Sequence, residues 1–148
     1  MNQKSLSVEL PFLKRGNSLC FVDQYKQGFE TVEKLPYGFS LLAKKLDIKA
    51  KNPVFNNSVK SGECPEKNGL VAYYTNRCPY SEYNVNTELT KTAEKRGIPL
   101  KIIKLKTMKQ AQSAPTPATI FSLFYNGNFL TTDIGSCLDS RFEKLFKK

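Results

Sequence analysis

The sequence predicts an α/β (α+β) protein in which a short β-rich segment precedes a domain of order β-α-β-(α)-β-β-α. Three observations predict this order: an apolar run followed by helical periodicity, a second apolar run, and an Asn-Gly pair between two further apolar runs. The 148 residues are 40% hydrophobic and 11% aromatic, which is typical of a globular chain. The composition therefore excludes a wholly disordered protein.

The predicted elements of the domain begin at residue 70. Residues 70–75 form a continuous apolar strand, and residues 81–96 form a helix because Val85, Leu89 and Ala93 recur every four positions. The later elements are a strand over 100–105, a short helical turn over 109–114, strands over 120–125 and 129–134, and a helix with Leu138, Phe142 and Leu145 at helical spacing.

Two glycines mark the ends of predicted elements. Gly97 follows the first helix, where a left-handed residue commonly ends a helix. Asn126 and Gly127 stand between the last two strands and form the strongest short signal for a hairpin. We therefore expect a parallel β-α-β unit, followed by an antiparallel hairpin that a helix covers.

The chain divides into three parts by composition. Residues 1–50 carry short strands, residues 51–67 are polar, contain prolines and lack periodicity, and residues 68–148 form the α/β domain. A connector is the simplest interpretation of the middle part. Short strands in 50 residues bury little core by themselves and expose sheet edges. We therefore expect residues 1–50 to contact a protein partner or a second copy of the chain.

The charge does not indicate a nucleic-acid partner, although the formal net charge is +10. The lysines are scattered, and the densest run, residues 100–106, alternates them with aliphatic residues as in a protected edge strand. No nucleic-acid motif occurs. No apolar run approaches the about 20 residues that span a bilayer, and the N-terminus lacks the features of a signal peptide. We expect a cytoplasmic protein without a nucleic-acid or membrane partner.

Four cysteines and no histidine limit the chemistry. The cysteines are Cys20, Cys64, Cys78 and Cys137, and none forms a C-x-x-C pair. The spacing is not that of a zinc site, and no Cys-His catalytic unit can form within the chain. For Cys20 and Cys137 we expect reduced thiols without a catalytic role.

Cys78 differs because it stands at the junction of the first strand and the first helix of the domain. Unpaired N–H groups and the helix dipole favour a thiolate at a helix N-terminus, and Arg77 adds a positive charge beside it. Pro79 suits the first helical turn because it has no N–H to satisfy. The same proline suits a purely structural turn, so a reactive thiol and a retained scaffold are both open interpretations.

The CPYS stretch at residues 78–81 resembles the C-P-Y-C motif of glutaredoxins, with Ser81 in place of the second cysteine. The element order also resembles the thioredoxin-like fold. The resemblance implies that Cys78 is the reactive thiol and that Pro117, or Pro115, is the cis-proline before the hairpin. Without a second cysteine in the motif, another thiol must resolve a mixed disulfide. Glutathione and Cys64 are the candidates.

A second resemblance covers about four fifths of the chain. Residues 26–46 resemble the closing strands of a GNAT acetyltransferase, and residues 51–55 (KNPVF) resemble the connector of YoaP-like GNAT proteins. In that family a thioredoxin-like C-terminal domain follows the acetyltransferase, and residues 111–117 and 121–127 resemble its signature. The resemblance identifies the chain as the C-terminal part of such an N-acetyltransferase, or as a truncated relative of one.

The acetyl-CoA site of GNAT enzymes has no counterpart in this sequence. These enzymes bind the pyrophosphate at a Gln/Arg-x-x-Gly-x-Gly/Ala turn that opens a helix, and residues 1–50 contain no such turn. We therefore expect no cofactor in this chain, and acetyl-CoA only if an N-terminal half is supplied. The expected role is structural or partner docking, and the alternative is a monothiol glutaredoxin-like oxidoreductase that uses Cys78.

Overall fold

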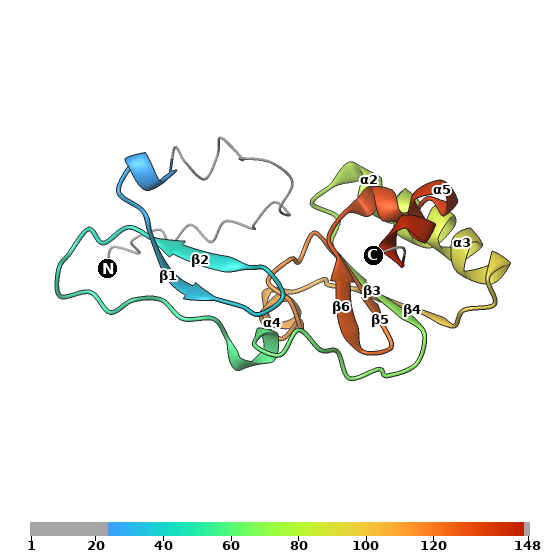
Figure 1. Ribbon diagram of the computed structural model, residues 1–148, viewed down its shortest axis with the longest axis horizontal. Helices are drawn as coiled ribbons and strands as arrows, with labels where there is room; N and C mark the ends of the chain where they lie inside the picture. Colours follow the sequence, from blue (N-terminus) through green and yellow to red (C-terminus); the bar gives the residue numbers. More distant parts are fainter. Residues whose placement is uncertain (1–23, 147–148) are drawn as a thin grey trace. The chain divides into compact units, whose positions relative to one another are not determined.

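The computed structural model describes residues 24–146 and divides the chain into two units, one up to Asn57 and one from Ser58 onward (Figure 1). The fold is mixed α/β, as predicted, and these residues form two separate sheets. Residues 1–23, part of the segment expected to carry short strands, lie outside the described residues. No helix within residues 24–146 is long and apolar enough to cross a membrane.

The described part of the first unit is an antiparallel hairpin. Its strands are β1 (Glu30–Lys34) and β2 (Ser40–Ala43). Gly38, with φ +101°, lies in the turn between them, where a left-handed backbone favours glycine. The backbone N–H of Phe55 donates a hydrogen bond of 2.6 Å to Oε2 of Glu33, and Phe55 is buried. The first half of the predicted connector therefore packs onto this hairpin.

The second unit contains a four-stranded sheet of order β4-β3-β5-β6. Its strands are β3 (Leu70–Tyr74), β4 (Leu100–Lys104), β5 (Phe121–Tyr125) and β6 (Asn128–Thr131). β3 pairs with β4 in parallel, and β5 is antiparallel to both β3 and β6. The lysine-rich strand β4 lies at the edge of the sheet, as its alternating charge predicted.

One long helix follows β3. It consists of α2 (Pro79–Tyr83), a π-helical stretch (Asn84–Leu89) and α3 (Thr90–Lys95), with helical backbone angles at both junctions. Gly97, with φ +62°, stands just beyond its C-terminal end, as predicted. The shorter helices are α4 (Met108–Gln112) and α5 (Asp139–Phe142), with 3-10 turns at Asn57–Val59, Ile134–Cys137 and Glu143–Leu145.

Two local signals fix the ends of the shorter elements. The hydroxyl of Thr107 accepts a hydrogen bond from the N–H of Gln110, and the Gln110 side chain accepts one in return from the N–H of Thr107, so a capping box begins α4. Asn126 (φ +48°) and Gly127 (φ +86°) form the tight turn between β5 and β6. The hairpin predicted from this Asn-Gly pair is confirmed.

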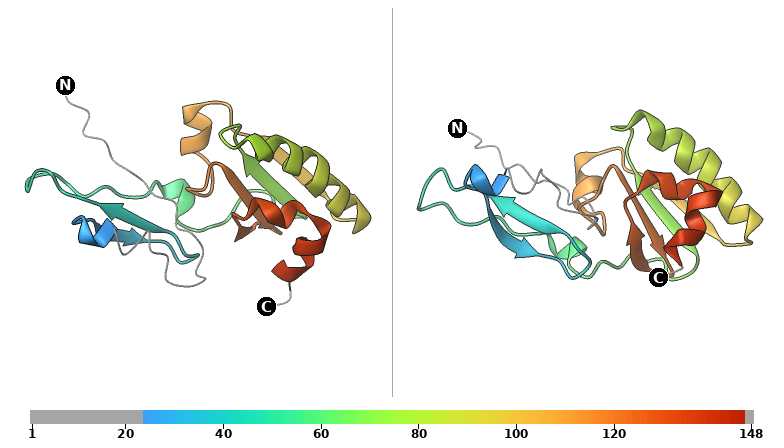
Figure 2. Two further views of the ribbon diagram at one scale, coloured as in Figure 1. Left: turned by 90° about the horizontal axis from the view of Figure 1, so that it is seen from above. Right: turned by 45° about the horizontal axis from the view of Figure 1, so that its top comes forward.

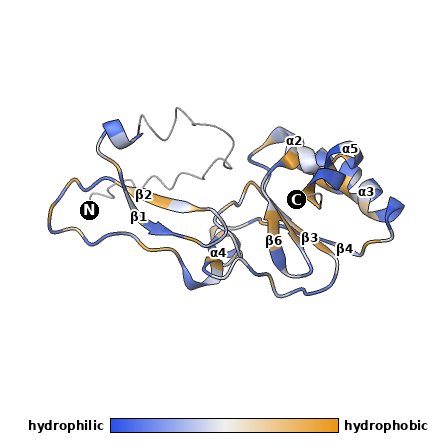
Figure 3. Ribbon diagram, in the orientation of Figure 1, coloured by the Kyte–Doolittle hydropathy of each residue, from blue (hydrophilic) through white to orange (hydrophobic). Residues whose placement is uncertain are grey.

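Alternating residues of the sheet enter two apolar clusters, because successive side chains of a strand point to opposite faces. On one face the long helix and α5 cover Leu70, Ala72 and Tyr74 of β3, and Figure 2 shows both helices on that side of the sheet. On the other face Val71 and Tyr73 pack with Phe124 of β5. Figure 3 shows hydrophobic residues along strands of this four-stranded sheet and hydrophilic residues on the outer parts of the helices.

The second half of the predicted connector belongs to the sheet. The N–H of Cys64 donates to the carbonyl of Gly127 at 2.8 Å, and the N–H of Phe129 donates to the carbonyl of Gly62 at 2.9 Å. Glu63 forms a bridge with Asn128 of β6. Residues 51–67 are therefore divided between the two units, whereas we expected one continuous connector.

Candidate thiol site

Cys78 lies immediately before the long helix. It is the N-cap residue of α2, with extended backbone angles (φ −105°, ψ 126°), and Pro79 occupies the first turn. The carbonyl of Cys78 accepts a hydrogen bond of 3.1 Å from the N–H of Ser81. Cys78 therefore lies at the N-terminus of the helix that follows β3, as the sequence predicted. Its side chain is partly exposed.

The segment before β5 runs beside this loop, but its prolines differ from the expectation. The N–H of Thr75 donates to the carbonyl of Ile120 at 3.1 Å, which holds the two segments together. No cis peptide bond occurs in residues 24–146, so the expected cis-proline at Pro117 or Pro115 is wrong. The peptide bonds here are trans. The hydroxyl of buried Thr116 accepts a hydrogen bond of 3.2 Å from the N–H of Ala118 and closes a local turn.

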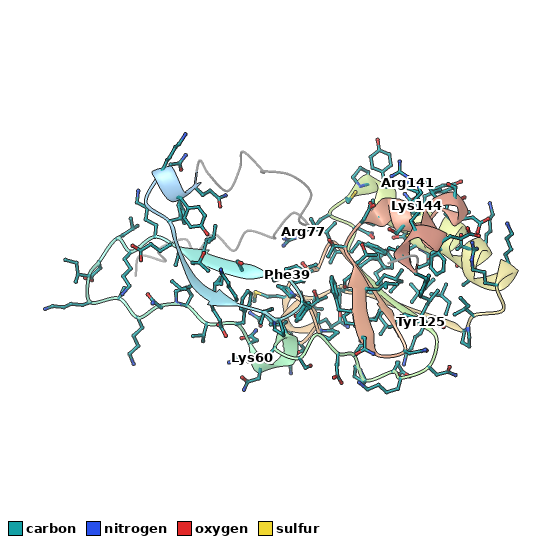
Figure 4. All side chains as sticks on the ribbon, in the orientation of Figure 1. Phe39, Lys60, Arg77, Tyr125, Arg141 and Lys144 are labelled. Atoms are coloured by element: carbon teal, nitrogen blue, oxygen red, sulfur yellow. The ribbon has the colours of Figure 1, made fainter. Side chains whose placement is uncertain are left out.

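Ser81 is fully buried in the first turn of the helix. Its exposed fraction is 0%, and its hydroxyl has no hydrogen-bond partner. The sequence contains the signal for this burial, because Ser81 precedes Val85 and Leu89 at the same spacing of four. Ser81 therefore lies on the core side of the helix. Arg77 is exposed on the loop before α2 (Figure 4).

Three exposed large side chains lie on the helix after the cysteine and on the segment before β5, and sequence reasoning missed them. Tyr80 is 69% exposed and Tyr83 is 59% exposed, both on α2. Ile120, which is 39% exposed, lies beside Thr75 on the neighbouring segment. The helical periodicity of the sequence could have predicted that the two tyrosines are exposed, because they lie on the face of the helix opposite Val85.

An ion pair fixes the start of the helix against the sheet. Nζ of Lys104, at the end of β4, donates to Oε2 of Glu82 at 2.8 Å. This hydrogen bond lowers the pKa of Glu82 from its usual value. Nδ2 of Asn86 donates to the hydroxyl of Tyr74 at 3.1 Å. These contacts connect the first two turns of the helix to β3 and β4.

The other described cysteines are buried. Cys64 is 1% exposed, its thiol donates to the carbonyl of Glu66 at 3.3 Å, and burial raises its pKa. We expected Cys64 in an exposed connector as a resolving thiol, and its position in the core does not support that role. Burial raises the pKa of Cys137 to about 12. Cys20 lies outside the described residues.

The site holds no group of metal ligands. No cluster of three or more His, Cys, Asp or Glu residues within residues 24–146 could bind a metal ion. Among the described residues, the geometry offers one accessible sulfur at a helix N-terminus, with an exposed arginine before it and two exposed tyrosines on the helix that follows.

These features define a mixed α/β protein with an accessible thiol at the start of a helix. The family model described as YoaP-like matches residues 99–144. An uncharacterized N-acetyltransferase, YoaP of Bacillus subtilis (strain 168), is 38% identical over 113 residues, which are 76% of this chain and 43% of the relative. No solved structure gives a significant match.

The chain is a YoaP-like protein, related to a protein that carries the name of an N-acetyltransferase. It spans about two fifths of the length of that curated relative, since the match covers 43% of it. The residues that match the family model run from the residue before β4 into the last 3-10 turn, so Cys78 lies outside them.

Proposed function

We propose that this chain supplies a non-catalytic part of a YoaP-like N-acetyltransferase, in which the second unit is a thioredoxin-like accessory domain for docking or stability. The observation that carries the proposal is the 38% identity, over 76% of the chain, to a protein named as an N-acetyltransferase. Acetyl-CoA belongs to the part of such a protein that contains the pyrophosphate-binding turn, and residues 1–50 lack that turn.

The hairpin of the first unit supports a docking role. Two strands alone are at best marginally stable in water, and within residues 24–146 each of these strands pairs on one side only. Leu41 and Leu42, both on β2, are already buried within the chain, so the docking role rests on the edges of the two strands. A protein partner, or a second copy of the chain, that contacts residues 1–50 would satisfy the unpaired edges of this hairpin.

We expect acetyl-CoA to leave the melting temperature of this chain unchanged. A ligand at a concentration of about 100 times its Kd stabilises a protein by about 2.7 kcal/mol, which a thermal-shift assay detects readily. The measurement is a titration with acetyl-CoA, with the longer Bacillus subtilis relative as the comparison protein. A reproducible rise in the melting temperature of this chain would contradict the proposal that it lacks the cofactor site.

Thiol–disulfide exchange at Cys78 is the second candidate function. The observation that favours it is that Cys78 is the cysteine with an accessible side chain among the three in residues 24–146. Its thiolate would attack one sulfur of a disulfide, form a mixed disulfide and release the other sulfur as a thiolate. Ser81 has no sulfur to complete the exchange, so glutathione would attack the mixed disulfide and free Cys78.

The variant Cys78→Ser tests this second function. With glutathione disulfide, we expect the wild-type chain to form a mixed disulfide at Cys78 and the variant to form none there. Cys137 provides the internal control, because a thiol with a pKa of about 12 stays protonated at pH 7–9 and is therefore unreactive. Peptide mass spectrometry locates the adducts. Equal activity of wild type and variant in a glutathione-coupled reductase assay rules out the exchange reaction.

A further inference from the structure

A basic loop follows β2 in the first unit. It comprises residues 44–51, and all eight of these residues are exposed. Its lysines are Lys44, Lys45, Lys49 and Lys51. Asp47 is its one acidic residue, so the loop has a formal net charge of +3. Figure 1 shows the chain making a wide loop beyond the end of β2.

A turn at the middle of this loop presents an aliphatic residue to solvent. The carbonyl of Asp47 accepts from the N–H of Ala50 at 3.0 Å, and its Oδ1 accepts from the N–H of Lys49 at 2.9 Å. Ile48 and Lys49 therefore occupy the two central positions of a closed turn. Ile48 is 93% exposed and Leu46 is 71% exposed. Neither side chain contributes to a core, although burial of each is favourable.

We propose that the 44–51 loop binds the surface of an anionic membrane. Leu46 and Ile48 enter the boundary between headgroups and acyl chains, and the four lysines lie at the level of the anionic headgroups. Apolar side chains combined with lysines bind such a surface through burial and charge together. The aliphatic stems of the lysines extend along the apolar region while their ammonium groups stay at the headgroups.

The composition of the loop favours a bilayer over a protein or a nucleic acid. Protein interfaces are enriched in aromatic residues and depleted in lysine, whereas this loop contains four lysines and no aromatic residue. A duplex has no apolar layer for two exposed aliphatic side chains. Figure 3 shows hydrophobic and hydrophilic residues in succession along the loop, and Figure 4 shows its side chains directed away from the ribbon.

This contact differs from the membrane span that the sequence excludes. A spanning segment requires about 20 apolar residues, but a peripheral contact requires only a short apolar tip with positive charges around it. The net charge of +10 attracts the whole chain toward an anionic surface. The exposure of Leu46 and Ile48, which the sequence pattern does not reveal, therefore changes the expectation of no membrane partner.

The test is co-sedimentation of the chain with two kinds of vesicle. One contains phosphatidylcholine alone, and the other contains phosphatidylcholine with about one third phosphatidylglycerol. We expect binding to the anionic vesicles only, with weaker binding at high salt. The variants Leu46→Ser/Ile48→Ser and Lys44→Glu/Lys45→Glu should each weaken this binding by at least about tenfold. All four side chains are exposed, so both variants should keep the fold.

A charge-matched variant on the second unit provides the control. Lys106→Glu/Lys109→Glu changes the net charge as much as Lys44→Glu/Lys45→Glu does, at two exposed residues outside the loop. We expect it to retain binding within about threefold, because the variant leaves every residue of the 44–51 loop unchanged. An equal loss in the control would overturn the proposal, since binding would then follow net charge alone.

Three further results would overturn it. The first is undiminished binding of Leu46→Ser/Ile48→Ser to anionic vesicles. The second is absence of vesicle binding combined with binding to duplex DNA or to a polyglutamate peptide. The third is absence of vesicle binding combined with a dimer in sedimentation velocity that this variant abolishes. In that last case the loop would contact a second copy of the chain.

Discussion

Replacement of Phe124 by alanine is expected to lower the free energy of unfolding of the second unit by about 3–5 kcal/mol. Phe124 is 0% exposed and is the fourth of the five residues of β5. Its ring packs at 5.6 Å from that of Tyr73 and at 5.8 Å from that of Phe129, both in edge-to-face contacts. The truncation removes buried area, two aromatic contacts and the filling of a close-packed site.

The effect should be measured by urea unfolding, with Met108→Ala as the control. Met108 is 77% exposed on α4, so its truncation removes a large side chain with little loss of burial, and we expect a change within about 0.5 kcal/mol. Because a domain has only about 5–15 kcal/mol of stability, Phe124→Ala should leave the second unit close to unfolding at 37 °C. A loss below about 1 kcal/mol would show that Phe124 is not central to this core.

The elements that the sequence predicted well have local signals. The repeat of Val85, Leu89 and Ala93 identified the long helix, and Asn126 with Gly127 identified the hairpin. These patterns involve residues less than a dozen positions apart. The helical spacing and the turn preference of Asn-Gly depend on local sequence and not on contacts with distant residues. The position of Cys78 at the helix N-terminus follows from the same local information.

The features that the sequence did not predict depend on contacts between distant residues. The pairing of Gly62 and Cys64 with the β5–β6 hairpin is a backbone contact across more than 60 residues, and backbone groups leave no residue pattern. The burial of Cys64 accompanies that pairing, whereas the polar, proline-containing pattern of residues 51–67 predicts a connector.

Replacement of Gly69 by alanine is expected to lower the free energy of unfolding by about 2–5 kcal/mol, from backbone strain and steric overlap together. Gly69 has φ +74°, and a Cβ atom there would lie 2.3 Å from the carbonyl oxygen of Pro99. That oxygen cannot move away easily, because it accepts a hydrogen bond of 2.8 Å from the N–H of Leu70.

The surroundings of Gly69 explain why this junction cannot absorb a methyl group. Its N–H donates to Oδ1 of Asn126 at 2.9 Å, and its carbonyl accepts from the N–H of Asn126 at 2.8 Å. Gly69 thus joins the start of β3, the residue before β4 and the β5–β6 turn at one point. A shift that relieves the overlap with Pro99 would lengthen these hydrogen bonds, and burial of unpaired backbone groups is costly.

The variant Gly97→Ala separates the contributions of backbone strain and steric overlap to the expected destabilisation. Gly97 has a similar φ of +62°, but no atom lies within 4 Å of the position that its Cβ would take. Alanine at this position should lower the free energy of unfolding by about 1–2 kcal/mol, from backbone strain alone. The difference between the two variants in urea unfolding therefore measures the overlap with Pro99. If Gly69→Ala is no less stable than Gly97→Ala, then β3 and β4 do not approach each other as closely as the structure shows.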